Sequence, residues 1–256
     1  MLNRECSFVA RIESAGEFLG TGILIAPQYV VTCFHVVGPE EMVQRDYVLF
    51  FGSGKDSVEQ RPGAVEAVSP SHDLALLRLD ECATGRPVQL VRGLTTSHER
   101  DLSALEWHVL GYSRRDARHF LRSVRMESPR HFSSDHQSGV LIDAQVGGGL
   151  HAGFSGGPVV LVGKGAWLCL GMACLGGEGA ATSRIILADC IVGFLEKRNV
   201  EIPQPLPGRS PAPWNATLAV PTSSGSEHAA SLARRSTYAP WTTSTPRSAC
   251  VQTIWP

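Results

Sequence analysis

Short runs of β-branched, aromatic and aliphatic residues, separated by turns rich in glycine and proline, recur along the first two hundred residues. Runs of this kind between turn signals are typical of antiparallel strands. In the first half, the expected strands are 6–12, 22–26, 29–33, 47–51, 64–68 and 74–79, with a turn over 16–22. In the second half, they are 107–112, 120–126, 140–144, 159–162, 167–174 and 184–188.

The two halves share this pattern of short apolar runs and turns, and a polar segment of mixed charge, about 81–101, connects them. Regularly spaced short strands in two such halves predict an all-β fold of two antiparallel six-stranded β-barrels packed side by side. The barrels are expected at about 5–85 and 103–190, with a short C-terminal helix at about 190–198. Together they make one domain, 1–200.

The composition changes at residue 201. Residues 201–256 contain nine of the sixteen prolines and fifteen serines or threonines, with only scattered apolar positions. Such a segment cannot bury enough apolar surface to fold by itself, so it is expected to be a disordered tail or linker. It would join the barrels to additional domains or partner proteins.

Charge and cysteine content narrow the classes of function. A net charge of −1 gives no support for a nucleic-acid or membrane partner. Neither a signal-peptide core nor an apolar run of membrane-spanning length is found. The seven cysteines are odd in number and form no C-x-x-C pair, so they indicate neither a zinc site nor a disulfide framework. Free thiols in apolar runs favour a reducing compartment, and a cytoplasmic location is expected.

The stretch Gly153–Pro158 places Ser155 between glycines, just before an apolar run. A serine hydroxyl becomes a nucleophile when it is exposed, lies beside a base, and faces donors for the oxyanion that it creates. Flanking glycines permit a tight turn and a close approach of substrate to backbone N–H groups. Taken alone, the stretch is more typical of an ordinary glycine-rich turn.

Two further polar residues stand out because of their apolar surroundings. His35 follows the expected strand 29–33, and Asp73 opens the expected strand 74–79. In isolation, His35 fits a core imidazole bonded to backbone, because a buried ring needs partners, and Asp73 fits the cap of a turn. Beside Ser155, the same two residues supply a base and an acid.

The segments Val31–Val37, His72–Leu77 and Gly153–Pro158 resemble the three signature segments of trypsin-like (chymotrypsin-fold) serine proteases, in that family's order of His, Asp and Ser. The segments Gly20–Ile25 and Gly171–Gly176 are similar to the strand before the histidine and the strand lining the substrate groove. The resemblance covers about 5–198. It is closest to the disulfide-free bacterial-type or HtrA-like branch.

The resemblance implies a serine endopeptidase acting on polypeptides through a covalent acyl-enzyme. Ser155 would be the nucleophile, His35 the general base and then acid, and Asp73 the group that orients the imidazole. Backbone N–H groups of Gly153 and Ser155 would form the oxyanion hole. No metal or organic cofactor is implied.

The implied substrate pocket comprises Gly149, Cys174, Leu175 and Gly176. Its base falls near Gly149, which is not an acid, so a preference for small or apolar side chains is expected over Lys or Arg. Cys174 stands where the family often has Ser or Thr beside the aspartate. The glycine-rich segment 147–149 lengthens the chain before Gly153 compared with that branch.

Two alternatives stay open at this stage. The same barrels would serve as a catalytically inactive module that binds peptides or acts as a scaffold. The G-x-S-x-G pattern at 153–157 also fits the nucleophile elbow of α/β-hydrolase esterases. That fold needs its acid and histidine after the serine, where the chain offers only Asp189 and His228, and it needs alternating helices.

Overall fold

The computed structural model describes residues 6–38, 46–52, 58–114, 120–127, 129–135, 137, 139–147, 150, 152–163, 166–174 and 182–202. The expected tail therefore lies, from residue 203 onward, outside the described residues. No helix within the described ranges is long and apolar enough to cross a membrane.

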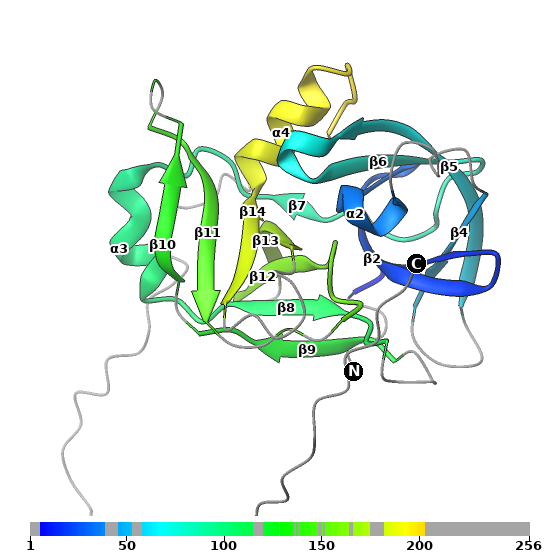
Figure 1. The fold of residues 1–256 in the computed structure, drawn as a ribbon, viewed down its shortest axis with the longest axis horizontal. Coiled ribbons are helices and arrows are strands. Elements are labelled where there is room, and N and C mark those ends of the chain that lie inside the picture. Colours follow the sequence, from blue (N-terminus) through cyan, green and yellow to red (C-terminus); the bar gives the residue numbers. More distant parts are fainter. Residues whose placement is uncertain are drawn as a thin grey trace, which may run out of the picture. The chain divides into compact units, whose positions relative to one another are not determined.

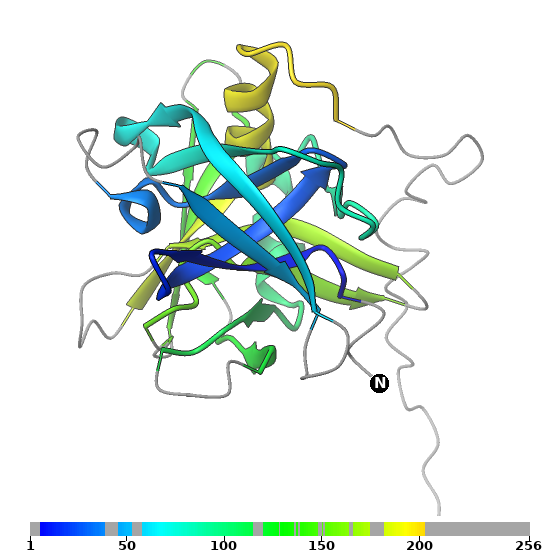
Figure 2. The same cartoon turned by 90° about the vertical axis from the view of Figure 1, so that its right-hand side faces the viewer.

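The first half is a closed six-stranded barrel (Figures 1 and 2). Its strands are β1 (Val9–Ser14), β2 (Glu17–Ala26), β3 (Tyr29–Thr32), β4 (Tyr47–Phe51), β5 (Glu59–Ser69) and β6 (Leu74–Leu79). They are hydrogen-bonded in the order β1-β2-β3-β6-β5-β4, and the antiparallel pairing of β1 with β4 closes the barrel. The short helix α2 (Phe34–Val37) follows β3, and a 3₁₀ turn, η2 (Pro70–His72), precedes β6. This half confirms the predicted barrel.

The second half is an eight-stranded sheet. Its strands are β7 (Gln89–Leu90), β8 (His108–Gly111), β9 (Arg122–Arg125), β10 (Pro129–Ser134), β11 (Leu141–Gly147), β12 (Pro158–Gly163), β13 (Ala166–Cys174) and β14 (Thr182–Leu187). The order is β10-β11-β14-β13-β12-β8-β9, and β7 pairs in parallel with β13. The turn η3 (Thr96–His98) and helix α3 (Glu99–Ser103) precede β8, and helix α4 (Ala188–Glu196) follows β14.

The predicted all-β architecture is confirmed, with two differences in detail. The second half has eight strands, and its strand order does not close into a six-stranded barrel, because β9 and β10 lie at opposite ends of that order. Of the predicted turn over 16–22, only Gly16 lies in a turn, since β2 already begins at Glu17. Gly20 and Gly22 lie inside this strand. Crowding explains why both positions are glycine, because a Cβ on Gly20 would come within 2.9 Å of Val36 and a Cβ on Gly22 within 2.6 Å of Val30.

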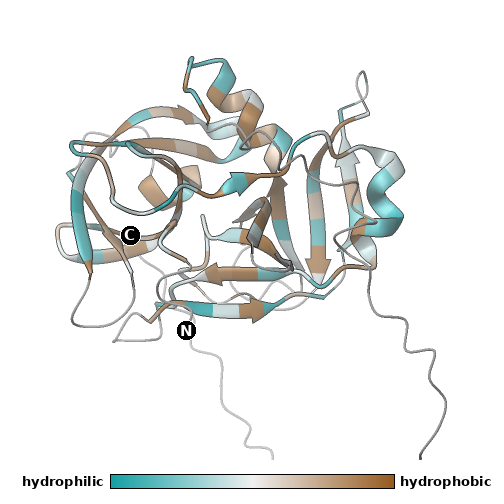
Figure 3. Cartoon of the chain, turned by 180° about the vertical axis from the view of Figure 1, so that it is seen from behind, coloured by the Kyte–Doolittle hydropathy of each residue, from teal (hydrophilic) through white to brown (hydrophobic). Residues whose placement is uncertain are grey.

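A continuous apolar core lies inside the barrel and extends to the strands of the second half that face it (Figure 3). All four residues from Leu74 to Leu77 in β6 are fully buried, which explains the uninterrupted apolar run in the sequence. Val160, Met172 and Ile186 of the second half belong to the same cluster. The ends of β3 and β6 are therefore held against the second half, where the candidate site lies.

Candidate active site

His35 lies on α2, the single helical turn after β3. The loop is fastened to the start of β6, because the Phe34 backbone N–H donates to the Asp73 carbonyl at 3.1 Å. The His35 backbone N–H donates to Asp73 Oδ1 at 2.9 Å. The imidazole side chain is 45% exposed. This turn therefore presents the ring to solvent while its backbone is fixed to the acid.

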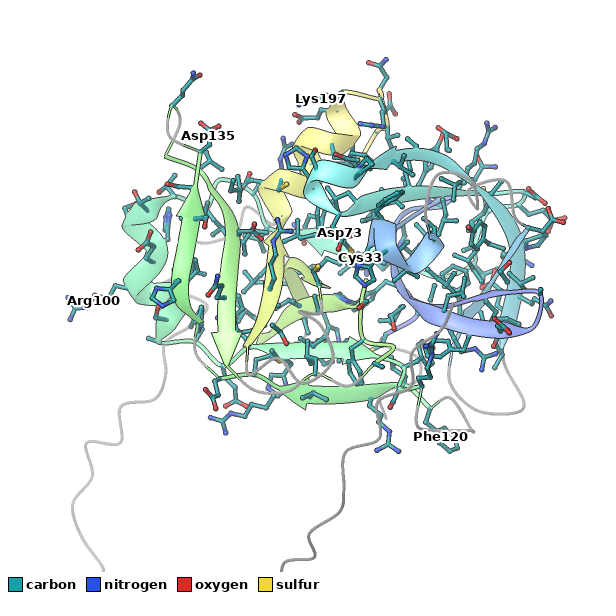
Figure 4. The ribbon with its side chains drawn as sticks, in the orientation of Figure 1. Cys33, Asp73, Arg100, Phe120, Asp135 and Lys197 are labelled. Carbon is teal, nitrogen blue, oxygen red and sulfur yellow. The ribbon has the colours of Figure 1, made fainter. Side chains whose placement is uncertain are left out.

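Asp73 receives three hydrogen bonds at its carboxylate. Besides the His35 backbone N–H on Oδ1, the His35 ring Nδ1 lies 2.8 Å from Oδ2, and the Cys174 thiol donates to Oδ2, also at 2.8 Å. The Asp73 backbone is left-handed, with φ 55°, where the chain leaves η2 for β6. Aspartate tolerates this conformation better than most residues do. Figure 4 shows Asp73 beside Cys33, between the barrel and the second sheet.

The two partners shift each other's pKa. Burial by itself lowers the pKa of His35, but the hydrogen bonds to Asp73 and Cys174 and the charge of Asp73 outweigh it and raise the pKa from 6.5 to about 9. Burial by itself raises the pKa of Asp73, and the hydrogen bonds from His35 and Cys174 reverse that and lower it. The structure therefore favours the charged form of both groups, the imidazolium of His35 and the carboxylate of Asp73.

The Ser155 loop lies between the two halves of the fold. Gly153 has φ 104° and Gly156 has φ 84°, conformations that favour glycine. A Cβ on Gly156 would come within 1.9 Å of the Thr21 carbonyl. The Gly156 N–H donates to the Ala173 carbonyl at 2.8 Å, and the Thr21 N–H donates to the Ser155 carbonyl at 2.9 Å. These bonds fix the backbone on both sides of the serine.

Thr21 is a site residue that sequence reasoning did not single out. Its fully buried hydroxyl donates to the Gly153 carbonyl at 2.7 Å and accepts the Tyr112 N–H at 3.2 Å. The Gly20–Ile25 segment drew attention to this strand, but nothing local shows that the hydroxyl reaches Gly153, which is 132 positions away. Thr21 thus anchors the start of the serine loop from the first barrel.

Among the described residues, the backbone N–H groups of Gly153 and Ser155 donate to no acceptor. Ser155 as a whole residue is buried, with 4% of its surface exposed. Within the described residues, no hydrogen bond joins the Ser155 hydroxyl to the His35 ring, which bonds to Asp73. The structure therefore brings His35 and Asp73 into direct contact and leaves Ser155 on the adjacent loop without that bond.

Cys174, the last residue of β13, is the one residue of the expected pocket that the structure describes. Gly149, Leu175 and Gly176 lie outside the described residues. Across the sheet, Cys174 is paired in register with Arg184 of β14. The Arg184 guanidinium is held by Asp143, with Nε 2.9 Å from Oδ1 and Nη2 2.6 Å from Oδ2. The cation next to Cys174 is thus already paired.

A second thiol, that of Cys33, lies close to His35, Asp73 and Cys174. The metal-binding atoms of Cys33, His35, Asp73 and Cys174 all lie within 4.8 Å of one another. Cys33 is fully buried, its thiol donates to the Ala173 carbonyl at 3.4 Å, and burial raises its pKa well above the usual value. Sequence spacing did not reveal this cluster, because Cys33 and Cys174 are brought together only by the contact between the two halves.

Comparison with known proteins places this geometry in a family. Residues 20–170, more than half of the chain, match the trypsin-like peptidase domain, and the chain belongs to that family. No curated protein sequence matches the chain significantly. The predicted family is therefore confirmed at the level of the domain.

Solved structures of similar fold are bacterial proteases. The Rv3671c protease from M. tuberculosis in its active form is 21% identical, with a TM-score of 0.53 over 79% of this chain and 85% of that one. The MamO protease domain from Magnetospirillum magneticum is 18% identical, with a TM-score of 0.53 over 76% and 99%. The serine endoprotease from Yersinia pestis is 14% identical, with a TM-score of 0.55 over 76% and 63%. At these identities the likeness concerns the fold.

Proposed function

We propose that the chain is a serine endopeptidase that hydrolyses peptide bonds through Ser155, His35 and Asp73. The Ser155 hydroxyl attacks the peptide carbonyl while neutral His35 takes its proton, and the resulting imidazolium then protonates the leaving amine. Asp73 keeps the ring proton on Nδ1, so that Nε2 is the atom that accepts. The N–H groups of Gly153 and Ser155 stabilise the oxyanion of the tetrahedral intermediate.

The observation that carries this proposal is the two-point contact between His35 and Asp73. One carboxylate oxygen holds the backbone N–H of His35 at 2.9 Å, and the other lies 2.8 Å from the ring Nδ1. A histidine that served only the core would not need its tautomer fixed by a carboxylate while its ring stays half-exposed. The N–H groups of Gly153 and Ser155, which donate to no acceptor within the described part of the chain, supply the matching site for the oxyanion.

An active-site-directed fluorophosphonate probe tests the proposal, because it forms a covalent bond only with an activated serine. We expect labelling of the reduced, chelator-treated protein at mildly alkaline pH, and its loss in Ser155→Ala. Ser113→Ala, which changes another buried serine outside the triad, is the matched control. Labelling that survives in Ser155→Ala would show that the nucleophile lies elsewhere.

A second candidate is a catalytically inactive module of the same fold that binds peptides. It is favoured by one observation, namely that the Ser155 hydroxyl and the His35 ring are not hydrogen-bonded to each other within the described residues. Catalytic hydrogen bonds in ligand-free sites are often long and tighten only with substrate. Absence of probe labelling together with saturable peptide binding would favour this candidate over the endopeptidase.

Substrate preference and location complete the proposal. A peptide library is expected to show cleavage after small or apolar side chains, as the position of Gly149 in the sequence indicates. We further propose a reducing compartment such as the cytoplasm. This is supported by Cys33, Cys82, Cys169, Cys174 and Cys190, which form no disulfide among the described residues.

A further inference from the structure

We propose that Cys33, His35, Asp73 and Cys174 together bind one thiophilic divalent cation of the zinc type, and that the bound ion switches off the neighbouring serine. The metal site itself stands independently of enzymatic activity. Its inhibitory effect rests on the proposed endopeptidase function.

The geometry is close to that of a tetrahedral zinc site. The four ligand atoms lie within 4.8 Å of one another, with His35 Nδ1 and Cys174 Sγ each 2.8 Å from Asp73 Oδ2. Zinc bonds of about 2.3 Å to sulfur and about 2.0–2.1 Å to nitrogen or oxygen place ligand atoms roughly 3.4–3.9 Å apart. The two short contacts therefore need to open by less than about 1 Å, which small side-chain rotations supply.

The ligand chemistry selects the class of metal. Two thiolates, an imidazole and one carboxylate oxygen form a soft-to-borderline set that suits Zn²⁺ and disfavours Mg²⁺ or Ca²⁺, which prefer oxygen. Cys33 is 0% exposed and Cys174 is 6% exposed, so the sulfur ligands lie at the bottom of the site. The 45% exposed imidazole of His35 forms its open side, through which an ion enters.

The surrounding backbone already orients two of the ligands, Asp73 and Cys33. The His35 N–H holds Asp73 Oδ1 at 2.9 Å, which leaves Oδ2 directed at the cluster. The Ala173 carbonyl, next to Cys174, lies 3.4 Å from Cys33 Sγ and keeps that sulfur near its partner. Such outer contacts pre-organise metal ligands and contribute to affinity.

A purely structural role accounts for the two thiols less well. A hydroxyl at position 174 would donate to the Asp73 carboxylate better than a thiol does, since a thiol is the weaker donor. At position 33 a small apolar side chain would fill the buried space without adding a polar group. What the pair of sulfurs adds beside His35 and Asp73 is the capacity to hold a soft metal ion.

The inhibitory effect follows from where the protons go. On binding, both thiol protons and the Nδ1 proton of the His35 imidazolium leave to solvent, and the metal takes the Nδ1 lone pair that is freed. A neutral imidazole that uses its Nδ1 lone pair for the metal carries its remaining proton on Nε2. Nε2 then has no lone pair to accept the proton of Ser155, so the general base is lost until the metal leaves.

Cobalt(II) titration into the reduced Ser155→Ala protein tests the site without any activity. We expect a single ion per chain, with the intense visible bands of tetrahedral cobalt and a thiolate-to-cobalt charge-transfer band in the near ultraviolet. Zn²⁺ should displace it. Replacing either ligand cysteine, in Cys33→Ser or Cys174→Ser, should weaken binding by about 100-fold or more. Cys82→Ser, which removes an exposed thiol outside the cluster, is the matched control and should bind unchanged.

Two outcomes overturn the metal site: no thiolate-to-cobalt band, or a band that persists in the Cys33→Ser/Cys174→Ser double variant. If a cysteine variant fails to fold, X-ray absorption of the zinc-loaded unmutated chain decides, and fewer than two sulfur ligands overturns the site. In active protein, stoichiometric Zn²⁺ should abolish probe labelling and a chelator should restore it; labelling unaffected by the bound metal overturns the inhibition. If the cobalt bands appear but the fluorophosphonate probe never labels the unmutated protein, the metal site is upheld and the proposed endopeptidase activity is refuted.

Discussion

The hydroxyl of Thr21, in a strand of the first barrel, donates a hydrogen bond of 2.7 Å to the Gly153 carbonyl in the second half of the molecule. The same oxygen accepts the Tyr112 N–H, and the Thr21 backbone N–H holds the Ser155 carbonyl. One residue of the first half thus holds the loop that carries the candidate nucleophile at two points, Gly153 and Ser155.

Replacing Thr21 by valine tests this role, because valine keeps the shape and removes the hydroxyl. The Gly153 carbonyl and the Tyr112 N–H lose a buried partner, so we expect a loss of about 1–3 kcal/mol in the free energy of unfolding. We also expect a lower kcat/KM, since the loop proposed to form the oxyanion hole loses the bond that holds its Gly153 carbonyl. Thr21→Ser, which retains the hydroxyl, is the control for both measurements. An unchanged kcat/KM in Thr21→Val would show that the contact serves stability alone.

Gly156 is expected to tolerate no side chain. Its φ is 84°, and a Cβ would lie 1.9 Å from the Thr21 carbonyl and 2.3 Å from the Thr32 hydroxyl. Gly156→Ala should therefore destabilise the fold by more than about 4 kcal/mol or prevent folding. Gly193→Ala in α4 is the matched control, since nothing lies within 4 Å of the added carbon. That variant should be more stable by about 0.5–1 kcal/mol. Denaturant unfolding measures both, and a mild effect at Gly156 would contradict the described loop geometry.

Asp73→Asn should leave the fold largely intact and remove most of the activity. The amide no longer enforces the proton on His35 Nδ1, so the ring loses the tautomer that leaves Nε2 free to accept. A loss of about 10⁴-fold in kcat is expected for replacement of the carboxylate in such a triad. Steady-state kinetics measures it, with circular dichroism as the control for folding. Retention of activity within a few-fold would mean that Asp73 does not orient the base.

The dependence of activity on pH follows from the raised pKa of His35. Only the neutral imidazole accepts the proton of Ser155, and the raised pKa of about 9 keeps the ring charged at neutral pH. We therefore expect kcat/KM, measured with a chelator present, to rise with pH and to reach half its maximum well above 6.5, towards 9. In Asp73→Asn the midpoint should move to lower pH. A midpoint at or below 6.5 in the unmutated chain would contradict the described His35–Asp73 pairing.

Much of the fold was predictable because its signals are local. The strand β6 follows from the apolar run after Asp73, and β3 from the β-branched run before His35. The strand β10 was missed because the polar sequence of Pro129–Ser134 shows no alternation, and β7 was missed because it has only two residues. The start of β2 was misplaced because glycines that relieve crowding inside a strand look like turn signals in the sequence.

The same distinction, between local signals and contacts over long sequence distances, applies to the candidate site. His35, Asp73 and Ser155 were found because each lies in a distinctive local stretch, and their order matched a known pattern. The contact between His35 and Asp73 is in the structure as expected, whereas the role of each residue in catalysis stays a prediction. The roles of Thr21 and Cys33 were not visible, since their partners are 132 and 140 positions away along the chain. Only the packing of one half on the other brings them together.

The bonds between Thr21 and the serine loop have a consequence for the nascent chain. The first barrel has all six of its strands once Leu79 has been made, yet the loop around Ser155 is also held by Ala173, almost a hundred residues later. When synthesis has passed Leu79, every strand of the first barrel is present, but the Ala173 carbonyl that accepts from Gly156 and the Cys174 thiol that donates to Asp73 are not.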